Sequence, residues 1–252
     1  MVKQITILST KTLSTIQKEE LVKANIQVIE ADFIKTENAS FEIKNLNKNL
    51  IFTSQNAVLS ILQHPTIEDL KQKTVFCVGL KTKELLNENG FTVEAYTGYA
   101  EDLAEIITLV YSDESFTFFS GNLRRDTLPE MLTENGISFN EIKVYDTTLT
   151  PHKISEKVDG ILFFSPSAVT SYLKTSQLEE LMRVNEDGKN VKIYIKSIGE
   201  TSLVKELLMF IEGSTKDNPN VILSLTGEFN LSEITTLTER MSLPGKEELE
   251  KA

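Results

Sequence analysis

The sequence predicts an α/β fold of two similar lobes, each a parallel sheet flanked by helices, joined by a two-stranded hinge. Predicted strands alternate with predicted helices through short turns, which is typical of parallel sheets. A strand, a polar turn and a helix start occur together at Leu50–Val58, LIFTSQNAV, and again at Ile161–Val169, ILFFSPSAV. Two further matches follow in the same order, so the sequence indicates an internal repeat.

The elements before residue 150 follow from apolar runs, polar turns and stop signals. Gly90 and Gly136 each end a predicted helix, and His64-Pro65 breaks the chain after the first motif. The expected strands are 4–9, 26–29, 50–52, 74–78, 91–96, 116–119 and 142–147. The expected helices are 16–24, 81–89, 101–111 and 124–135, with one more beginning at Ala57.

The second half of the chain is expected to repeat this order of strands and helices. The other matched pairs are KIYIKSIG at 192–199 with TVFCVG at 74–79, and LSEITTL at 231–237 with LAEIITL at 103–109. The first of these pairs predicts that a helix begins after Gly199, as one does after Gly79. The offsets between the copies rise slowly, so we expect added residues in the second copy at 185–190 and 212–220.

Two extended segments, Ala31–Glu37 and Val144–Thr150, are predicted to carry the chain between the lobes and to pair as a narrow ladder. Lobe one is then 1–34 plus 149–241, lobe two is 35–148, and 242–252 is a charged tail. Ligands of open α/β sheets bind outside the carboxyl ends of the strands. We therefore expect both sets of strand-end turns to face one cleft between lobes that move relative to each other.

The composition excludes several classes of protein. The formal net charge of −11 argues against a general binder of nucleic acid or of an anionic membrane. The single Cys77 cannot form an internal disulfide, which predicts a cytoplasmic protein. We expect no membrane association, because no apolar run approaches spanning length and the N-terminus lacks a signal-type core.

Candidate binding groups gather at the turns that follow predicted strands. A helix start is a natural anion site, because its unpaired N–H groups and the helix dipole point the same way. Hydroxyl groups and positive side chains at these turns add further donors. The candidate binding residues are Thr53, Ser54, Asn56, Gly79, Lys81, Thr82, Ser120, Gly121, Arg124, Ser165, Ser167, Gly199, Thr201 and Ser202.

Each of these assignments has a structural alternative. Ser, Thr and Asn are favoured as ordinary helix caps, and Arg124 with Arg125 is equally compatible with a solvated helix face. His64 and His152 lie beside prolines without metal-ligand spacing, so we interpret them as surface residues and predict no metal site. No GxGxxG pattern is present, so a dinucleotide site is unsupported, and we interpret Cys77 as a buried small apolar residue.

The ordered set of motifs resembles the uroporphyrinogen-III synthase family over about residues 1–240. In chain order the motifs are TSQNAV, VGLKT, SGNLRR, VYDT, FFSPSAV and IGETS. Each is weakly specific by itself, but their order is distinctive. Two departures are that the family's IGxTT pattern ends here in Ser202 and that the segment 212–219 is longer than expected.

The resemblance implies a cofactor-free, monomeric lyase of haem and tetrapyrrole biosynthesis. Its substrate would be hydroxymethylbilane, an anionic chain of four pyrroles with eight carboxylates, which it would close to uroporphyrinogen III with loss of water and inversion of the last ring. This is mainly a positioning task. Tyr145 matches the family's tyrosine that is suspected of helping the hydroxyl leave, and its structural alternative is a half-buried strand aromatic.

Two other functional classes stay open at this point. One is a non-catalytic two-lobed protein that binds a small ligand, and the other is a regulatory protein that kept the fold and lost activity. Ser202 and the longer second copy keep the regulatory alternative open. Turnover of hydroxymethylbilane separates both classes from the enzyme.

Overall fold

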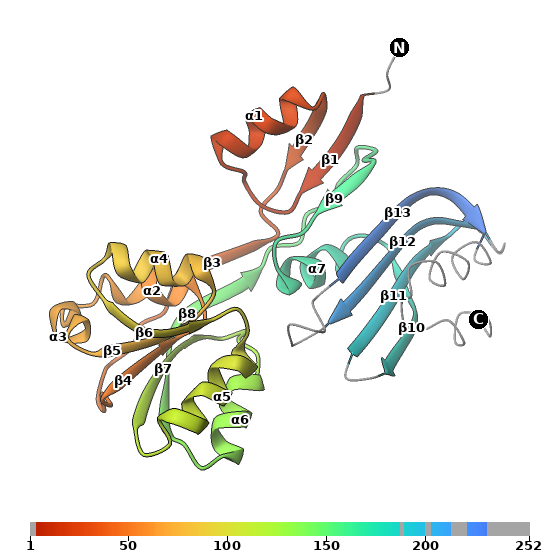
Figure 1. Cartoon of the computed structure of the whole chain (residues 1–252). Coiled ribbons are helices and arrows are strands. Elements are labelled where there is room, and N and C mark those ends of the chain that lie inside the picture. The colour runs from red at the N-terminus through yellow and green to blue at the C-terminus, as the bar shows by residue number, and fades with distance from the viewer. Residues whose placement is uncertain (1–3, 187–188, 200–202, 213–220, 231–252) are drawn as a thin grey trace. The chain divides into compact units, whose positions relative to one another are not determined.

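A computed structural model describes residues 4–186, 189–199, 203–212 and 221–230 (Figure 1). These residues form two compact units. Unit 1 holds the described residues 4–35 and 149–230, and unit 2 holds 36–148. The expected charged tail at 242–252 and the expected match at 231–237 lie outside the described residues.

Unit 2 is a six-stranded sheet in the order β3-β8-β7-β4-β5-β6. Its strands are β3 Ile34–Asn38, β4 Asn49–Phe52, β5 Thr74–Val78, β6 Thr92–Thr97, β7 Ser115–Gly121 and β8 Ser138–Leu149. Its helices are α2 Gln55–Ile61, α3 Ile67–Lys71, α4 Leu80–Glu88, α5 Ala100–Val110 and α6 Thr127–Glu134. The five strands from β4 to β8 are parallel, so the predicted alternation of strands and helices is confirmed here.

The two faces of this sheet carry separate apolar cores. On one face, α2 and α4 pack Val58, Ile61 and Leu86 against Phe52 and Cys77. Burial raises the pKa of the Cys77 thiol to about 11, which agrees with its interpretation as an apolar residue. The opposite face is covered by α5 and α6 through the buried residues Leu103, Ile107, Leu128 and Leu132.

The predicted ladder between the two chain crossings is confirmed. β3 and β8 are neighbours in the sheet, and both run across the boundary between the units. The Ala39 N–H donates to the Val144 oxygen at 3.0 Å, and the Thr150 N–H donates to the Phe33 oxygen at 2.9 Å. The residue numbers change in opposite directions along the pair, so the two strands are antiparallel.

Unit 1 begins with a three-stranded parallel sheet in the order β2-β1-β9. Its strands are β1 Ile5–Ser9, β2 Ile26–Glu30 and β9 Gly160–Leu162, and its helices are α1 Thr15–Lys23 and α7 Pro166–Leu173. This order matches β8-β7-β4 of unit 2, with β9 in the place of β4. The predicted repeat of LIFTSQNAV in ILFFSPSAV is therefore visible in the topology of the described residues.

The rest of unit 1 departs from the predicted repeat. Four antiparallel strands form a second sheet in the order β10-β11-β12-β13. They are β10 Glu179–Glu186, β11 Lys189–Ser197, β12 Leu203–Glu212 and β13 Val221–Asn230. The strand predicted at 192–199 is present, but the helix expected after Gly199 is replaced by β12. Of the residues expected as insertions, 185–186 end β10 and 189–190 begin β11, while 187–188 and 213–220 lie outside the described residues.

Burial explains why residues 203–212 form a strand. Leu207, Met209 and Ile211 are buried in one apolar cluster, while Leu208 and Phe210 are buried in another that includes Phe33 and Tyr172. Alternate residues on opposite faces are what a strand supplies. The apolar residues of this segment also fit a helical spacing, so sequence periodicity alone does not separate the two structures.

We expect Phe52→Ala to destabilise unit 2 by about 3–5 kcal/mol, the usual cost of removing a large buried aromatic side chain. Phe52 is fully buried and stacks on Phe119 with ring centroids 5.2 Å apart. Native-state hydrogen exchange of the β4, β5 and β7 amides measures this loss for unit 2 alone. Leu59→Ala is the control, because Leu59 is 47% exposed. A loss below about 1 kcal/mol for Phe52→Ala would contradict the packing described.

Candidate functional site

The carboxyl ends of β4, β5 and β7 bring most of the predicted unit 2 residues together. Phe52, the last residue of β4, is in register with Phe119 on one side and Cys77 on the other. The turn that begins at Thr53 therefore lies between the turns after β7 and β5. The chain order of the strands reverses between β4 and β7, and a crevice at such a reversal is the usual binding place in open α/β sheets.

Ser54 and Ser165 both cap helices. The Ser54 hydroxyl accepts from the Asn56 N–H at 3.1 Å at the start of α2, and the Ser165 hydroxyl accepts from the Ala168 N–H at 3.2 Å at the start of α7. Their side-chain oxygens are thus already used, as the capping alternative expects. Other N–H groups of these first turns, including that of Ser167, are the donors such a helix start presents.

The turn after β5 depends on Gly79. Its φ of +91° is a left-handed conformation that favours glycine, and its N–H donates to the Thr97 oxygen at 2.8 Å. Thr82 lies in the first turn of α4 and is only 5% exposed, while Lys81 is exposed. Lys81 is therefore the accessible cation of this turn, and Thr82 is less accessible than the sequence suggested.

Arg124 is paired with carboxylates of its own unit. Its guanidinium contacts both carboxylate oxygens of Glu141 at 2.7 and 2.9 Å and also binds Asp126. The Ser120 hydroxyl donates at 2.5 Å to Oε1 of Glu141, the oxygen that Arg124 contacts at 2.7 Å. Burial raises the pKa of Glu141, but the hydrogen bonds from Arg124 and Ser120 outweigh it, so the net shift is downward.

This pairing changes the interpretation of Arg124. The expectation was a free positive charge for an anionic ligand or a solvated helix face. The structure instead places Arg124 before α6, where it fixes the turn after β7 through Glu141 on β8. Arg125 also has interactions within the structure. No local sequence pattern marks this pair, because Glu141 lies 17 residues further along the chain.

Tyr145 lies directly against Gly121. The two residues are opposite each other on β8 and β7, next to an irregularity that shifts the register between Ser120 and Gly121. A Cβ atom built on Gly121 would lie 2.3 Å from Cζ and 2.7 Å from the hydroxyl oxygen of Tyr145. Only glycine leaves room for the ring at this position.

Asn122 fixes the same part of β8. Its side-chain oxygen accepts from the Thr147 N–H at 2.7 Å, its amide donates to the Thr147 oxygen at 3.1 Å, and its own N–H donates to the Tyr145 oxygen at 3.3 Å. Within the described ranges, the Tyr145 hydroxyl makes no hydrogen bond. Gly121 and Asn122 thus hold a half-buried phenol with a free hydroxyl at the end of β7.

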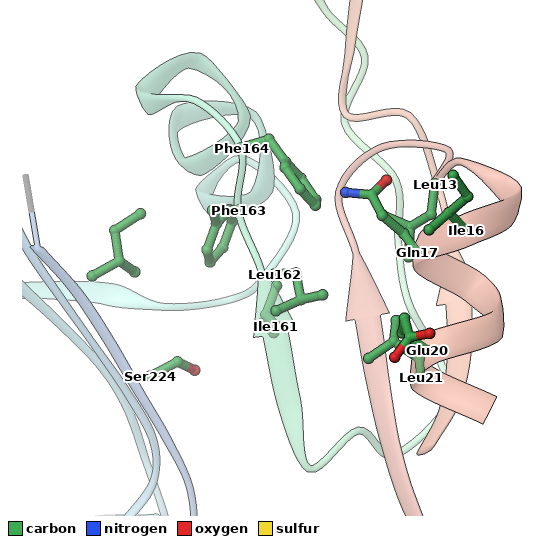
Figure 2. A pocket seen from close by; sticks show the side chains of 11 residues that line it. Leu13, Ile16, Gln17, Glu20, Leu21, Ile161, Leu162, Phe163, Phe164 and Ser224 are labelled. Carbon is green, nitrogen blue, oxygen red and sulfur yellow. The ribbon is translucent and has the colours of Figure 1, made fainter. Parts of the chain in front are cut away.

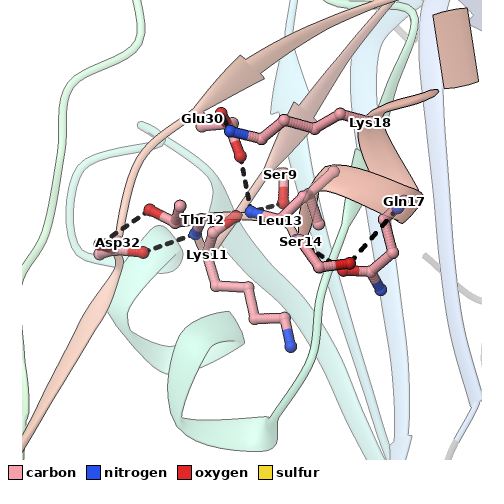
Figure 3. A network of polar contacts seen from close by, with 9 residues as sticks. All are labelled: Ser9, Lys11, Thr12, Leu13, Ser14, Gln17, Lys18, Glu30 and Asp32. Carbon is pink, nitrogen blue, oxygen red and sulfur yellow. Dashed lines mark hydrogen bonds and ion pairs between the residues drawn. The ribbon is translucent and has the colours of Figure 1, made fainter.

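The turn after β1 in unit 1 is the counterpart of the turn after β7. Asp32 accepts from the Thr12 N–H at 2.7 Å, and Glu30 accepts from the Leu13 N–H at 2.6 Å (Figure 3). Hydrogen bonds from the Leu13 N–H and from Lys18 lower the pKa of Glu30. An acidic residue at the end of β2 therefore holds this turn, as Glu141 on β8 holds the turn after β7.

Lys11 is a candidate binding residue that the sequence reasoning missed. Its ammonium lies 4.3 Å from the ring centroid of Phe164, and Figure 3 shows its side chain extending away from the hydrogen-bonded network. Thr10, beside it, donates through its hydroxyl to the Leu162 oxygen at 2.8 Å. The topology is the signal that finds Lys11, because β1 and β9 meet where the strand order of this sheet reverses.

A mainly apolar cavity of about 540 Å³ lies beside these turns in unit 1. Leu13, which precedes α1, and Ile16 of α1 stand across it from Phe164 (Figure 2). Gln17, Glu20 and Ser224 are the polar side chains of its lining. The carboxyl-end turns of unit 1 therefore have an apolar wall next to their hydrogen-bond donors.

Gly199 does not lie at a helix start. It has a φ of +60° in the turn between β11 and β12, where the Ile198 N–H donates to the Leu203 oxygen at 2.9 Å. The predicted binding role of Gly199 rested on a helix that is replaced by β12, so its predicted place is wrong. Thr201 and Ser202 lie outside the described residues.

Both histidines make contacts with other residues of the protein. His64 stacks on Phe41 and contacts the Thr66 hydroxyl at 2.9 Å, and a ring nitrogen of His152 lies 3.1 Å from the Asp32 oxygen. In the described part of the chain, no group of three His, Cys, Asp or Glu side chains is placed to hold a metal ion. None of the described helices is long and apolar enough to cross a membrane.

Solved structures share this fold. Uroporphyrinogen-III synthetase from Helicobacter pylori matches with a TM-score of 0.52 and 21% identity, covering 68% of this chain and 78% of that one. A mutant uroporphyrinogen III synthase from the extremely thermophilic bacterium Thermus thermophilus matches with a TM-score of 0.51 and 14% identity, covering 68% of this chain and 77% of that one.

Sequence comparison gives the family. A curated relative, the uroporphyrinogen-III synthase of Chlorobaculum parvum, is 28% identical over an alignment of 163 residues, which covers 57% of this chain and 66% of the relative. The match thus spans just under two thirds of that relative's length. The sequence model of the family described as uroporphyrinogen-III synthase HemD matches residues 17–203. This match covers well over half of the chain, and the chain therefore belongs to the uroporphyrinogen-III synthase family.

Proposed function

We propose that this protein is a uroporphyrinogen-III synthase, a hydro-lyase that cyclises hydroxymethylbilane to uroporphyrinogen III. The observation that carries the proposal is the phenol of Tyr145, held against Gly121 at the end of β7, next to the strand-order reversal, in a chain that belongs to this family. Hydrogen-bond donors for carboxylates surround the same strand ends. A positioned donor beside anion-binding turns suits the closure of a flexible polyanion.

The reaction begins with loss of the terminal hydroxyl as water. The Tyr145 phenol donates the proton that this leaving group needs, and the substrate becomes an azafulvene cation. The cation attacks the substituted carbon of the last pyrrole and gives a spiro intermediate, which fragments and closes again with that ring inverted. The ring carbon that forms the final bond loses a proton, which restores the phenol, so the net change is the loss of one water.

Carboxylate binding falls to the groups that remain accessible. In unit 2 these are Thr53, Asn56, Lys81 and the backbone N–H groups at the start of α4. In unit 1 they are Lys11 and the N–H groups at the start of α7, beside the apolar cavity that suits pyrrole rings. Ser54, Ser165, Ser120 and Arg124 are engaged within the protein and fix the turns instead.

The monomeric state, the absence of a cofactor and the cytoplasmic location stay predictions. Size-exclusion chromatography with light scattering measures the first directly. Assays without added metal or nucleotide test the second.

Purified protein is expected to convert fresh hydroxymethylbilane mainly into uroporphyrinogen III. The isomers are separated by chromatography after oxidation to porphyrins, and an enzyme-free reaction, which gives type I, is the control. Type I as the main product in the presence of protein would reject the proposal in favour of a non-catalytic binding or regulatory protein.

Tyr145→Phe is expected to lower kcat by about 10²–10⁴-fold, the usual contribution of a positioned proton donor. Thr82→Ala is the comparison, because Thr82 is buried and one of many hydroxyls near the strand ends. Initial rates at saturating substrate are compared after circular dichroism has shown that both variants are folded. An equal or smaller loss for Tyr145→Phe would return Tyr145 to the role of a packed strand aromatic.

Gly121→Ala is expected to lower kcat by about 10²-fold or more, because its methyl group displaces the Tyr145 ring. Gly98→Ala is the matched control, since a Cβ there meets nothing within 4 Å. In a Tyr145→Phe background the same change should cost much less activity, because the phenol is already absent. Additive losses in the double variant would show that Gly121 acts independently of Tyr145.

A further inference from the structure

A second cavity in unit 1, of about 700 Å³, contains none of the binding residues predicted from the sequence. It is lined by the connection at 152–158, by the end of α7 and the residues after it, and by strands β11, β12 and β13. Its volume lies within the range of small-molecule sites.

Four lysines from three separate parts of the chain line this cavity. Lys153 and Lys157 come from the connection, Lys196 from β11 and Lys205 from β12. Lys196 donates to the Gln177 side-chain oxygen at 3.1 Å. Within the described ranges, the other three lysines have no ion pair or hydrogen bond of their own. Such a convergence of cations is notable in a chain of formal net charge −11.

β12 is irregular where its side chains line the cavity, and the irregularity shifts the register of its pairing with β11 and of its pairing with β13. Glu206 is in register with Lys196 and Thr226, whereas Val204 is in register with Ser197 and Phe229. Lys205 therefore has no register partner on either neighbouring strand. Consecutive residues of a regular strand point to opposite faces, yet Lys205 and Glu206 both line this cavity. A bulge re-aims side chains in this way and is common beside functional sites.

Glycine permits the bulge on the neighbouring strand. Thr226, Gly227 and Glu228 are consecutive and also line the cavity, and Gly227 has a φ of +146°. This backbone conformation favours glycine. The sheet is thus locally reshaped at the position where the cations gather.

Three carboxylates share the lining, and two of them are already engaged. Glu206 accepts from the Tyr172 hydroxyl at 2.6 Å, and Glu156 accepts from the Ser155 hydroxyl at 3.2 Å. Burial, followed by the bond to Glu206, raises the pKa of Tyr172, so this hydroxyl keeps its proton. Glu228 is the third carboxylate. Lys153, Lys157 and Lys205 remain as donors for a ligand, beside the apolar side chains of Ile154 and Val158.

We propose that this cavity binds a small organic anion with at least two carboxylate groups, held by Lys153, Lys157 and Lys205. Two kinds of molecule could supply such a set of carboxylate groups. One is the tetrapyrrole of the proposed function, with its eight carboxylates, and this arm rests on that function. The other is an unrelated small polycarboxylate. Binding is measured without turnover, so failure of the assay for uroporphyrinogen III leaves this proposal standing.

The test compares Lys153→Gln/Lys205→Gln with the matched double variant Lys23→Gln/Lys44→Gln. The control removes the same charge at two exposed lysines that are paired with Glu20 and Glu42. Citrate binding is measured by isothermal titration calorimetry, and binding of the octacarboxylate uroporphyrin I is measured by its fluorescence anisotropy. Melting temperatures establish folding, and Lys157→Gln is used alone if the cavity variant is unstable.

We expect the cavity variant to weaken binding of at least one probe about tenfold, since each exposed charge contact contributes modestly, while the control leaves it unchanged. Weakening for uroporphyrin I identifies the tetrapyrrole as a ligand, and weakening for citrate alone identifies a small polycarboxylate. The proposal is overturned if neither probe binds at millimolar concentration, or if the cavity and control variants bind both probes equally.

Discussion

The pairing of β4 with β7 is the constraint on which the candidate site of unit 2 depends. Phe52, the last residue of β4, lies opposite Phe119 of β7, and the two rings stack in the core with Phe91 edge-on to Phe52. This contact holds the end of β4 beside the last part of β7. The turn that begins at Thr53 and the turn after β7 consequently open side by side, and hydrogen bonds such as those of Ser120 and Arg124 to Glu141 then fix the donors within the turn after β7.

The two units reuse this arrangement only in part. In each of them an acidic side chain from the neighbouring strand holds the turn at the reversal point, Glu141 in unit 2 and Glu30 in unit 1. The charges that remain available differ, because Arg124 is neutralised in place whereas Lys11 rests on an aromatic face. Similar topology therefore gives one turn whose cation is structural and another whose cation can meet a ligand.

Most strands and helices before residue 174 could be predicted from the sequence, because they have an apolar period or clear stop signals, although the short helix α3 was not predicted. The motif repeat identified β4 and β9 as equivalents, and the structure confirms this through the strand orders. The segment 203–212 could not be predicted, since its apolar residues satisfy both a helical and a strand period and tertiary burial decides between them. Site residues joined by long-range contacts, such as Arg124 with Glu141, were also beyond local patterns. The role of Lys11 as a candidate binding residue follows only from the pairing of β1 with β9, which no local sequence pattern indicates.

The contact of Tyr145 with Gly121 has a consequence for how this chain can diverge. The phenyl ring occupies the volume that any side chain at 121 would need. A side chain at 121 is therefore tolerated only where residue 145 has already become small. If residue 121 changes first, the intermediate protein is strained. Residues 121 and 145 are therefore expected to change together. An alignment of many relatives should show glycine at the position of 121 wherever an aromatic residue occupies the position of 145.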